Sequence, residues 1–371
     1  MRDEQPLYRN EEHNFYALTR FRDVEDALID WETFISGKGS TLDMIQAGFP
    51  MPPGMILMED PPIHNAHRGL LSRIFTAPRM NALEPQIRQF CAESLDPCIG
   101  AGGFDFIKDL GAHMPMRAIG MLLGIPEQDQ EAIRDMFDYG MQLHDEGEEP
   151  PPFEMNAMGL YNDYVEWREK NPSDDLMTEL IRAEFEDPTT GEIRTLNRGE
   201  ILTYILLLSG AGNETTTRLI GWMGKLLAEH PDQRREIVED RSLLAGAVEE
   251  TLRFEAPSPV QARWVTRDVE LHGQVVPKDS IMLLVNGSAN RDDRKFENGD
   301  TYDIHRNIAH HLSFGYRIHF CLGASLARLE GRVALDEVLN RFPEWEIDWD
   351  NAKQAHTATV RGWQRMPVVT K

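Results

Sequence analysis

The chain has 371 residues, of which 41% are hydrophobic and 27% charged, a balance typical of a soluble globular protein rather than of a disordered or membrane-embedded chain. Its net charge of −24 would repel a phosphate backbone, which argues against nucleic acid as a partner. The odd, sparse set of Cys91, Cys98 and Cys321 fits free thiols, and the polar start from Met1 to Arg9 contains no signal peptide or membrane anchor. We therefore expect a cytoplasmic protein.

Helical periodicity dominates, and no repeat or flexible linker divides the chain, so we predict one mainly α domain over residues 1–371 with small β-sheets. The predicted helices span residues 24–31, 83–95, 106–123, 155–168, 174–185, 198–229, 226–238, 243–254 and 324–341. Short strands are expected at residues 15–19, 262–265, 269–271, 281–285 and 345–349, where β-formers cluster.

The longest predicted helix, residues 198–229, begins with an apolar run over 201–208 that is too short to span a bilayer. A polar patch containing glycine follows at residues 209–215 and costs stability in a buried helix. A simple kink is one interpretation. We favour a functional one, because the acid of Glu214 and the hydroxyl of Thr215 are adjacent.

Cys321 lies at the entrance of the last predicted helix, residues 324–341. Unpaired N–H groups and the helix dipole at such an entrance favour a thiolate, which is the form of cysteine that binds a metal. A buried structural cysteine is the alternative.

The segment FGYRIHFCLG, residues 314–323, resembles the cysteine-ligand loop of the cytochrome P450 family, the haem-thiolate monooxygenases. Phe314, Cys321 and Gly323 stand at its motif positions. The resemblance implies the P450 fold, with haem b between the long central helix and this loop and with Cys321 as the iron ligand. Its thiolate would push electron density towards the iron and favour O–O cleavage.

Glu250 and Arg253 match the E-x-x-R pair of the family, and Arg306 matches the arginine that joins it. A spacing of three places Glu250 and Arg253 on one helix face, where one carboxylate can hold a guanidinium and bridge to a second. The resemblance implies a structural role for all three.

Residues 211–216, AGNETT, resemble the oxygen-activation motif of the family. Heterolytic cleavage of dioxygen needs two protons, so the motif implies Thr215 as the local donor and Glu214 as the relay. Ala211 is expected at the cofactor, and Gly212 is expected to leave room for dioxygen.

The haem propionates need cationic or hydrogen-bonding partners. His64 and Arg68 lie four residues apart on a predicted helix, after a segment that resembles the propionate-binding helix of the family. Arg263, on a predicted strand, and His319 match two further propionate contacts.

By resemblance, the substrate pocket has apolar walls, which favour a hydrophobic small molecule. The expected wall residues are Met55, Ile56, Leu207, Ala211, Pro259, Val260, Thr359 and Val360. Packing of the long loop at residues 39–58 onto the core is the alternative for its apolar side chains.

Two features depart from the family pattern. Arg317 stands where the cysteine loop usually has a second glycine, so its backbone must adopt strained dihedral angles or its side chain must point to solvent. Relatives also carry an additional helix before the position at which this chain starts, which predicts a looser substrate entrance.

Electrons must come from outside, because the sequence has no glycine-rich nucleotide fingerprint and no cluster-type cysteine spacing. We expect a ferredoxin or flavodoxin with its reductase. Residues 61–83 and 304–329 contain no acid, and a basic patch there would steer an acidic donor. Its arginines are Arg68, Arg73, Arg79, Arg306, Arg317 and Arg328. Alternatively, the propionates and neighbouring groups neutralise these charges.

The sequence therefore predicts a monooxygenase that inserts one atom of O2 into a hydrophobic molecule by hydroxylation or epoxidation. A peroxide-driven haem-thiolate enzyme and a non-catalytic haem-binding sensor are the alternatives. A haem-free helical scaffold, with Cys321 as a structural thiol, is a further one.

Overall fold

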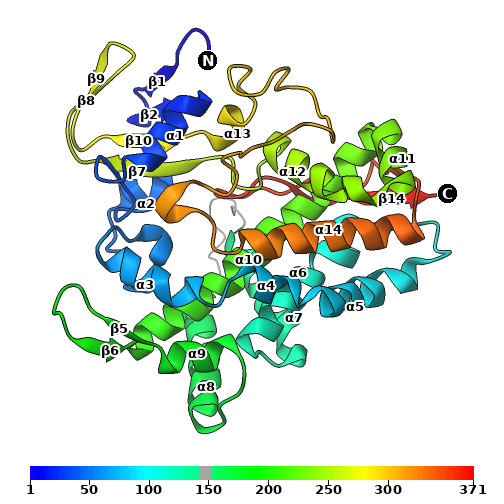
Figure 1. The fold of residues 1–371 in the computed structure, drawn as a ribbon, viewed down its shortest axis with the longest axis horizontal. Helices are drawn as coiled ribbons and strands as arrows, with labels where there is room; N and C mark the ends of the chain where they lie inside the picture. The colour runs from blue at the N-terminus through cyan, green and yellow to red at the C-terminus, as the bar shows by residue number, and fades with distance from the viewer. Residues whose placement is uncertain (142–152) are drawn as a thin grey trace.

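The computed structural model describes residues 1–141 and 153–371, and its elements are arranged around one long helix, α10 (Arg198–Glu229) (Figure 1). This helix has the bounds that the sequence predicts. It begins with a capping box, in which the Asn197 side chain accepts from the Glu200 N–H and the Glu200 carboxylate accepts from the Asn197 N–H. Most of its 32 residues are buried, so α10 forms the centre of the main core.

Helices account for most of the regular structure. The other α-helices are α1 (Phe21–Ile29), α2 (Leu42–Ala47), α3 (Ile63–Ser72), α4 (Ala77–Asn81), α5 (Glu84–Leu95), α6 (Met114–Leu123), α7 (Glu127–Met141), α8 (Phe153–Lys170), α9 (Leu176–Arg182), α11 (Pro231–Glu239), α12 (Leu244–Phe254), α13 (Asn286–Ala289) and α14 (Ala324–Arg341). Within residues 1–141 and 153–371, every helix falls short of the length or the apolar character that a bilayer span requires.

The largest sheet has five strands in the order β1 (Leu7–Asn10), β2 (Phe15–Leu18), β10 (Ile281–Leu284), β7 (Gln261–Val265) and β3 (Phe34–Ile35). A second sheet has the order β11 (Trp345–Ile347), β14 (Pro367–Thr370) and β4 (Gly103–Asp105). Three antiparallel pairs complete the strands: β5 (Glu184–Glu186) with β6 (Ile193–Thr195), β8 (Val269–Leu271) with β9 (Gln274–Val276), and β12 (Lys353–Gln354) with β13 (Trp363–Arg365). The predicted mainly α class with small sheets is confirmed.

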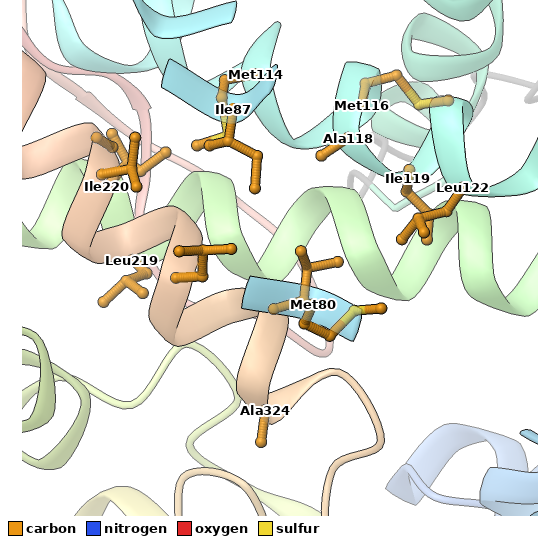
Figure 2. Packing of buried hydrophobic residues seen from close by; sticks show 14 of the residues in the cluster. Met80, Ile87, Met114, Met116, Ala118, Ile119, Leu122, Leu219, Ile220 and Ala324 are labelled. Atoms are coloured by element: carbon orange, nitrogen blue, oxygen red, sulfur yellow. The ribbon is translucent and has the colours of Figure 1, made fainter. Parts of the chain in front are cut away.

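The main core surrounds α10. Figure 2 shows Met80 of α4, Ile87 of α5 and Ile119 of α6 gathered around α10 and α14. Leu219 and Ile220 contribute from α10 itself, and all five side chains are almost completely buried. Because α10 contacts both α6 and α14, any residue on its central turns is held by rigid neighbours.

Prolines break two of the predicted helices. The predicted helix at 106–123 is a π-helical segment, Phe106–Gly111, followed by α6, which has Pro115 in its first turn. The predicted helix at 226–238 is divided between α10 and α11, and Pro231 is the first residue of α11. In both cases the apolar periodicity of the sequence continues across the break, although the proline marks the start of a new helix.

Short elements account for the other differences. The predicted helix at 174–185 ends at Arg182, and Phe185 belongs to the hairpin of β5 and β6. Several strands of two to four residues were not predicted, because segments that short carry little periodic signal. Helix α7, which has 15 residues, was not predicted either.

One buried carboxyl group lies between the two central helices. Glu330 of α14 is 1% exposed, and its Oε1 has no hydrogen-bond partner in the described part of the chain. Burial raises the pKa of Glu330 well above its usual value, and the Thr216 hydroxyl of α10 opposes this only in part. Burial therefore favours the protonated form of Glu330 inside the core.

We expect Glu330→Gln to stabilise the protein above pH 5. A group with a raised pKa binds more protons in the folded state, so the free energy of unfolding falls as pH rises above about 4.5, the ordinary value. Glutamine has no such slope, and the gain at pH 8 should be at least ~1 kcal/mol. Urea unfolding from pH 5 to 8 measures this. Parallel curves for the two proteins would contradict the prediction.

Candidate active site

The segment from Phe314 to Gly323 forms a closed loop immediately before α14. The Cys321 N–H donates to the Phe314 carbonyl at 2.7 Å, and Gly323 is the N-cap of α14. Gly315 has a φ of +68°, a value that glycine adopts without strain. Helix α14, which follows the loop directly, packs against α10 (Figure 1).

The Cys321 side chain is open to solvent on one side and surrounded by protein on the others. This desolvation raises the pKa of Cys321, although the Gly323 N–H and the charges of Arg68 and Arg328 act to lower it. The helix entrance thus acts in the predicted direction through the Gly323 N–H, while desolvation acts against it. A metal ion on the sulfur would supply the missing stabilisation, since a coordinated thiol is deprotonated.

Leu207, Ala211 and Thr215 of α10, spaced four residues apart, share one face of the helix. Ala211 is exposed and the other two are half-buried, although most of α10 is buried. The Thr215 hydroxyl donates to the Ala211 carbonyl at 2.9 Å, a bond that replaces a partner from outside the helix. The described protein therefore leaves this face of α10 uncovered.

Gly212 does not face that open side. A Cβ at Gly212 would lie 3.2 Å from Cγ1 of Ile119, which belongs to α6 (Figure 2). The expectation that Gly212 leaves room for dioxygen is therefore corrected: the glycine allows α6 to approach α10.

Glu214 is 2% exposed and forms an ion pair with Arg218, with 2.5 Å between its Oε2 and the guanidinium Nη2. Arg218 also donates to the Trp363 carbonyl. The sequence analysis missed Arg218, although its spacing of four from Glu214 is the signal of a helical ion pair. The Glu214 carboxylate is held in an ion pair, so a proton relay through it would first need this pair to open.

Four side chains predicted to bind propionates meet at one place. His64 and Arg68 lie on α3, Arg263 lies on β7, and His319 belongs to the cysteine loop. The rings of His64 and His319 are 4.4 Å apart, and Arg68 donates to the Phe320 carbonyl. The tertiary structure thus gathers residues from three distant segments.

The charge of this cluster is not balanced by a neighbouring anion. Arg263 is 4% exposed and donates only to Gln261 and the Ala262 carbonyl, and burial lowers its pKa to about 10. Burial, followed by the charge of Arg263, lowers the pKa of His319 to about 2. The nearby Asp60 carboxylate already accepts from two backbone N–H groups. Such a cluster fits a ligand with two carboxylates.

The E-x-x-R arrangement is present as predicted. Arg253 donates to both carboxylate oxygens of Glu250, at 2.6 and 2.7 Å, and both side chains are fully buried. Arg306 donates to the same carboxylate at 3.3 Å. Arg253 also binds the carbonyls of Asn290 and Gly299, so the pair anchors the segment after α13.

A family model described as Cytochrome P450 matches residues 152–361. The cytochrome P450 123 of Mycobacterium tuberculosis is 37% identical over 377 residues, which cover 99% of this chain and 92% of that protein. The cyclomarin C epoxidase CymV of Salinispora arenicola is 35% identical, covering 94% of this chain and 88% of that protein. The crystal structure of HmtN, a post-tailoring hydroxylase involved in himastatin biosynthesis, has a TM-score of 0.88 at 31% identity and covers 100% of this chain and 95% of that chain.

The chain belongs to the cytochrome P450 family. Its relatives include a hydroxylase and an epoxidase, and the protein is a P450 monooxygenase. The family uses haem iron, and three features of this P450 fit it: one open thiol, an unbalanced cationic cluster suited to two propionates, and an uncovered face on the central helix. No group of three or more metal-ligating side chains occurs among the described residues.

The P450 fold joins two of the predicted pocket segments. The Arg361 N–H donates to the Pro257 carbonyl at 2.8 Å, and the Ser258 hydroxyl donates to the Thr359 carbonyl at 3.4 Å. Of the predicted wall residues, Ala211 and Val260 are exposed, Met55, Leu207, Pro259 and Thr359 are half-buried, and Ile56 and Val360 are buried. The burial of the last two favours packing over a role in the pocket wall.

The predicted basic patch is smaller than the sequence suggests. Four of its arginines have partners: Arg68 with the Phe320 carbonyl, Arg79 with Glu179, Arg306 with Glu250 and Arg328 with Glu249. Arg73 and Arg317 are exposed and form no ion pair with any described residue. The alternative that neighbours neutralise these charges thus holds for part of the set.

Arg317 adopts the strained conformation that its replacement of glycine predicts, with a φ of +54°. Its guanidinium is exposed and lies 5.5 Å from the centre of the Tyr316 ring. A left-handed backbone costs a residue with a Cβ about 1–2 kcal/mol.

We expect Arg317→Gly to stabilise this P450 by about 0.5–1 kcal/mol, because relief of the strain exceeds the extra entropy of glycine in the unfolded chain. Urea unfolding followed by tryptophan fluorescence measures the gain. Arg317→Ala is the matched control, since it removes the charge and keeps the Cβ. Equal effects of the two substitutions would show that charge, not backbone strain, matters at this position.

Proposed function

We propose that this P450 inserts one atom of O2 into a hydrophobic small molecule, by hydroxylation or epoxidation, with haem b held by Cys321. The observation that carries the proposal is the open thiol of Cys321 at the start of α14, next to a cationic cluster without a balancing anion. The hydroxylase and epoxidase relatives support both reaction types.

Each part of the cofactor has a partner in this chain. The Cys321 sulfur would ligate the iron, with the Gly323 N–H and the Arg68 charge stabilising its thiolate form. His64, Arg68, Arg263 and His319 would hold the two propionates, which would in turn offset the desolvation of these side chains. When bound, the haem iron supplies the activation of dioxygen.

On α10, Thr215 would donate protons and Glu214 would relay them. The Thr215 hydroxyl lies on the uncovered face of the helix, where it is able to donate a hydrogen bond to a ligand instead of to the Ala211 carbonyl. Relay by Glu214 requires its carboxylate to rotate away from Arg218. Proton delivery by this pair thus includes a step in which a buried ion pair opens.

The substrate proposal rests on the same helix face. Leu207 and Ala211 present apolar surface one and two turns before Thr215, and Val260 adds an exposed apolar side chain from the segment after α12. Apolar surface of this kind binds hydrophobic molecules by removing both partners from water.

The first experiment is the spectrum of the ferrous protein under carbon monoxide, which has a red-shifted Soret band when a thiolate ligates the iron. Its absence, or an unchanged spectrum after Cys321→His, would remove the haem-thiolate proposal. An unchanged spectrum after addition of haem to the haem-free protein would favour the structural-thiol alternative.

Thr215→Ala is expected to reduce product formed per reductant consumed by about 10-fold or more, with the missing electrons recovered as hydrogen peroxide, because the local proton donor is lost. Thr215→Ser keeps the hydroxyl and should stay close to the parent. Product and peroxide are measured with a ferredoxin, its reductase and a substrate found by spin-state titration. A peroxide-driven enzyme would be insensitive to the change, and a sensor would show no substrate-dependent consumption of reductant.

We further propose an acidic ferredoxin or flavodoxin, with its reductase, as the electron donor, and Arg73 with Arg317 as its contacts. Arg73 follows directly after α3, and α3 is joined to the cysteine loop through Arg68. Both cations lack an ion-pair partner in the described ranges, so they are free to attract an acidic surface.

Arg73→Glu should slow haem reduction about threefold to tenfold at low ionic strength, with a smaller effect at high salt, because charge steering is screened. The spin-state dissociation constant of the substrate should not change. Arg235→Glu, an exposed position on α11, is the matched control. Equal rates for the two variants would exclude Arg73 from the donor site.

A further inference from the structure

A second glutamate on α12, directly before Glu250, contacts a different set of partners. The Glu249 carboxylate accepts from Arg328 of α14, at 2.5 Å from Nε and 3.0 Å from Nη2. It also lies 3.3 Å from Nε2 of His311. Desolvation by itself would raise the pKa of Glu249, but the bonds to His311 and Arg328 outweigh it and lower the pKa to about 2. Glu249 is therefore an anion that holds two side chains.

Both partners of Glu249 contact the same aromatic ring. The Arg328 guanidinium carbon lies 4.6 Å from the centre of the Phe314 ring, and the His311 ring lies 5.6 Å from it. Phe314 begins the cysteine loop, and its carbonyl accepts the Cys321 N–H at 2.7 Å. The contacts thus run without a gap from Glu249 through Arg328 and His311 to Phe314 and the backbone of Cys321.

Arg328 brings a positive charge to the cysteine loop, because its guanidinium lies over the Phe314 ring and the Phe314 carbonyl accepts the Cys321 N–H. Arg68 is attached to the cysteine loop itself through the Phe320 carbonyl. Arg328, whose side chain is 39% exposed, is held in place by Glu249, which is its one ion-pair partner among the described residues. Without that carboxylate, the contact with the Phe314 ring would have to hold the guanidinium against its tendency to move into solvent.

We propose that Glu249 is a positioning residue for the cysteine ligand, because through Arg328 and His311 it clamps Phe314 and keeps a positive charge beside Cys321. This inference rests on the haem-thiolate function proposed above. The ion pair of Glu249 with Arg328 would then tune the haem potential as well as join α12 to α14.

The test compares reduction potentials of the haem-loaded protein, measured by spectroelectrochemistry. Arg328→Gln removes the cation and should disfavour reduction. Glu249→Gln leaves the guanidinium without its ion-pair partner, so it should move the potential in the same direction, by a smaller amount because it also removes an anion. The Arg328→Gln change in the one-electron equilibrium constant should be about threefold, the size of a partly exposed ion pair, which is roughly 28 mV. The shared sign is the signature of positioning, because loss of an anion alone would favour reduction.

Glu84→Gln is the matched control, because Glu84 of α5 pairs with Arg332 of the same α14 at 2.7 Å with similar exposure. It should lower stability without moving the potential. Loss of clamping in Glu249→Gln should also leave part of the ferrous carbon monoxide complex without the thiolate band, whereas Glu84→Gln should retain it fully.

Potentials that stay at the parent value in both Glu249→Gln and Arg328→Gln, or that move in opposite directions, would overturn the proposal and leave Glu249 as a structural ion-pair residue. If Glu249→Gln fails to fold, Arg328→Gln alone takes its place, and a potential equal to that of the parent would likewise overturn it. A parent protein without the thiolate band would instead reject the haem-thiolate function, and this inference with it.

Discussion

The hydrogen bond from the Cys321 N–H to the Phe314 carbonyl closes the loop on which the site depends. It places the sulfur two residues before the N-cap of α14, close to the N–H of Gly323. Because the bond joins two residues seven positions apart, the chain between them must turn sharply, and Arg317 adopts a left-handed backbone to do so. The glycine usual in the family would make this turn without strain, so Arg317 adds a conformational cost at this position.

Electrostatics give the site its second constraint. Buried cations are normally paired, yet among the described residues Arg263 donates to Gln261 and to the Ala262 carbonyl rather than to a carboxylate. The cluster of Arg263 with His64 and His319 therefore suits an anion that comes from outside the chain. In the same way, desolvation of Cys321 opposes the charged form that a metal would stabilise. A haem group would offset both costs.

Two buried carboxyl groups near the centre of α10 behave in opposite ways. Glu214 is paired with Arg218, whereas Glu330 has no cationic partner in the described part of the chain, and burial raises its pKa. The physical reason is the presence or absence of one guanidinium, because the two side chains are buried to a similar extent. The core next to the candidate catalytic turn therefore contains an ion pair on α10 and, on the facing helix α14, a buried acid without a cationic partner in the described chain.

The sequence by itself determined the helical class, the bounds of α10 and α14, and the residues of the cysteine loop, because these depend on local periodicity, capping and motif spacing. The spacing of Glu250 and Arg253 likewise predicted their ion pair. Only the tertiary structure decided that Gly212 faces Ile119, that neighbouring groups desolvate Cys321, and that Glu249 reaches the cysteine loop through Arg328. These outcomes depend on which helices pack against each other and on how much water that packing removes, and neither quantity is encoded in the spacing of residues along the chain.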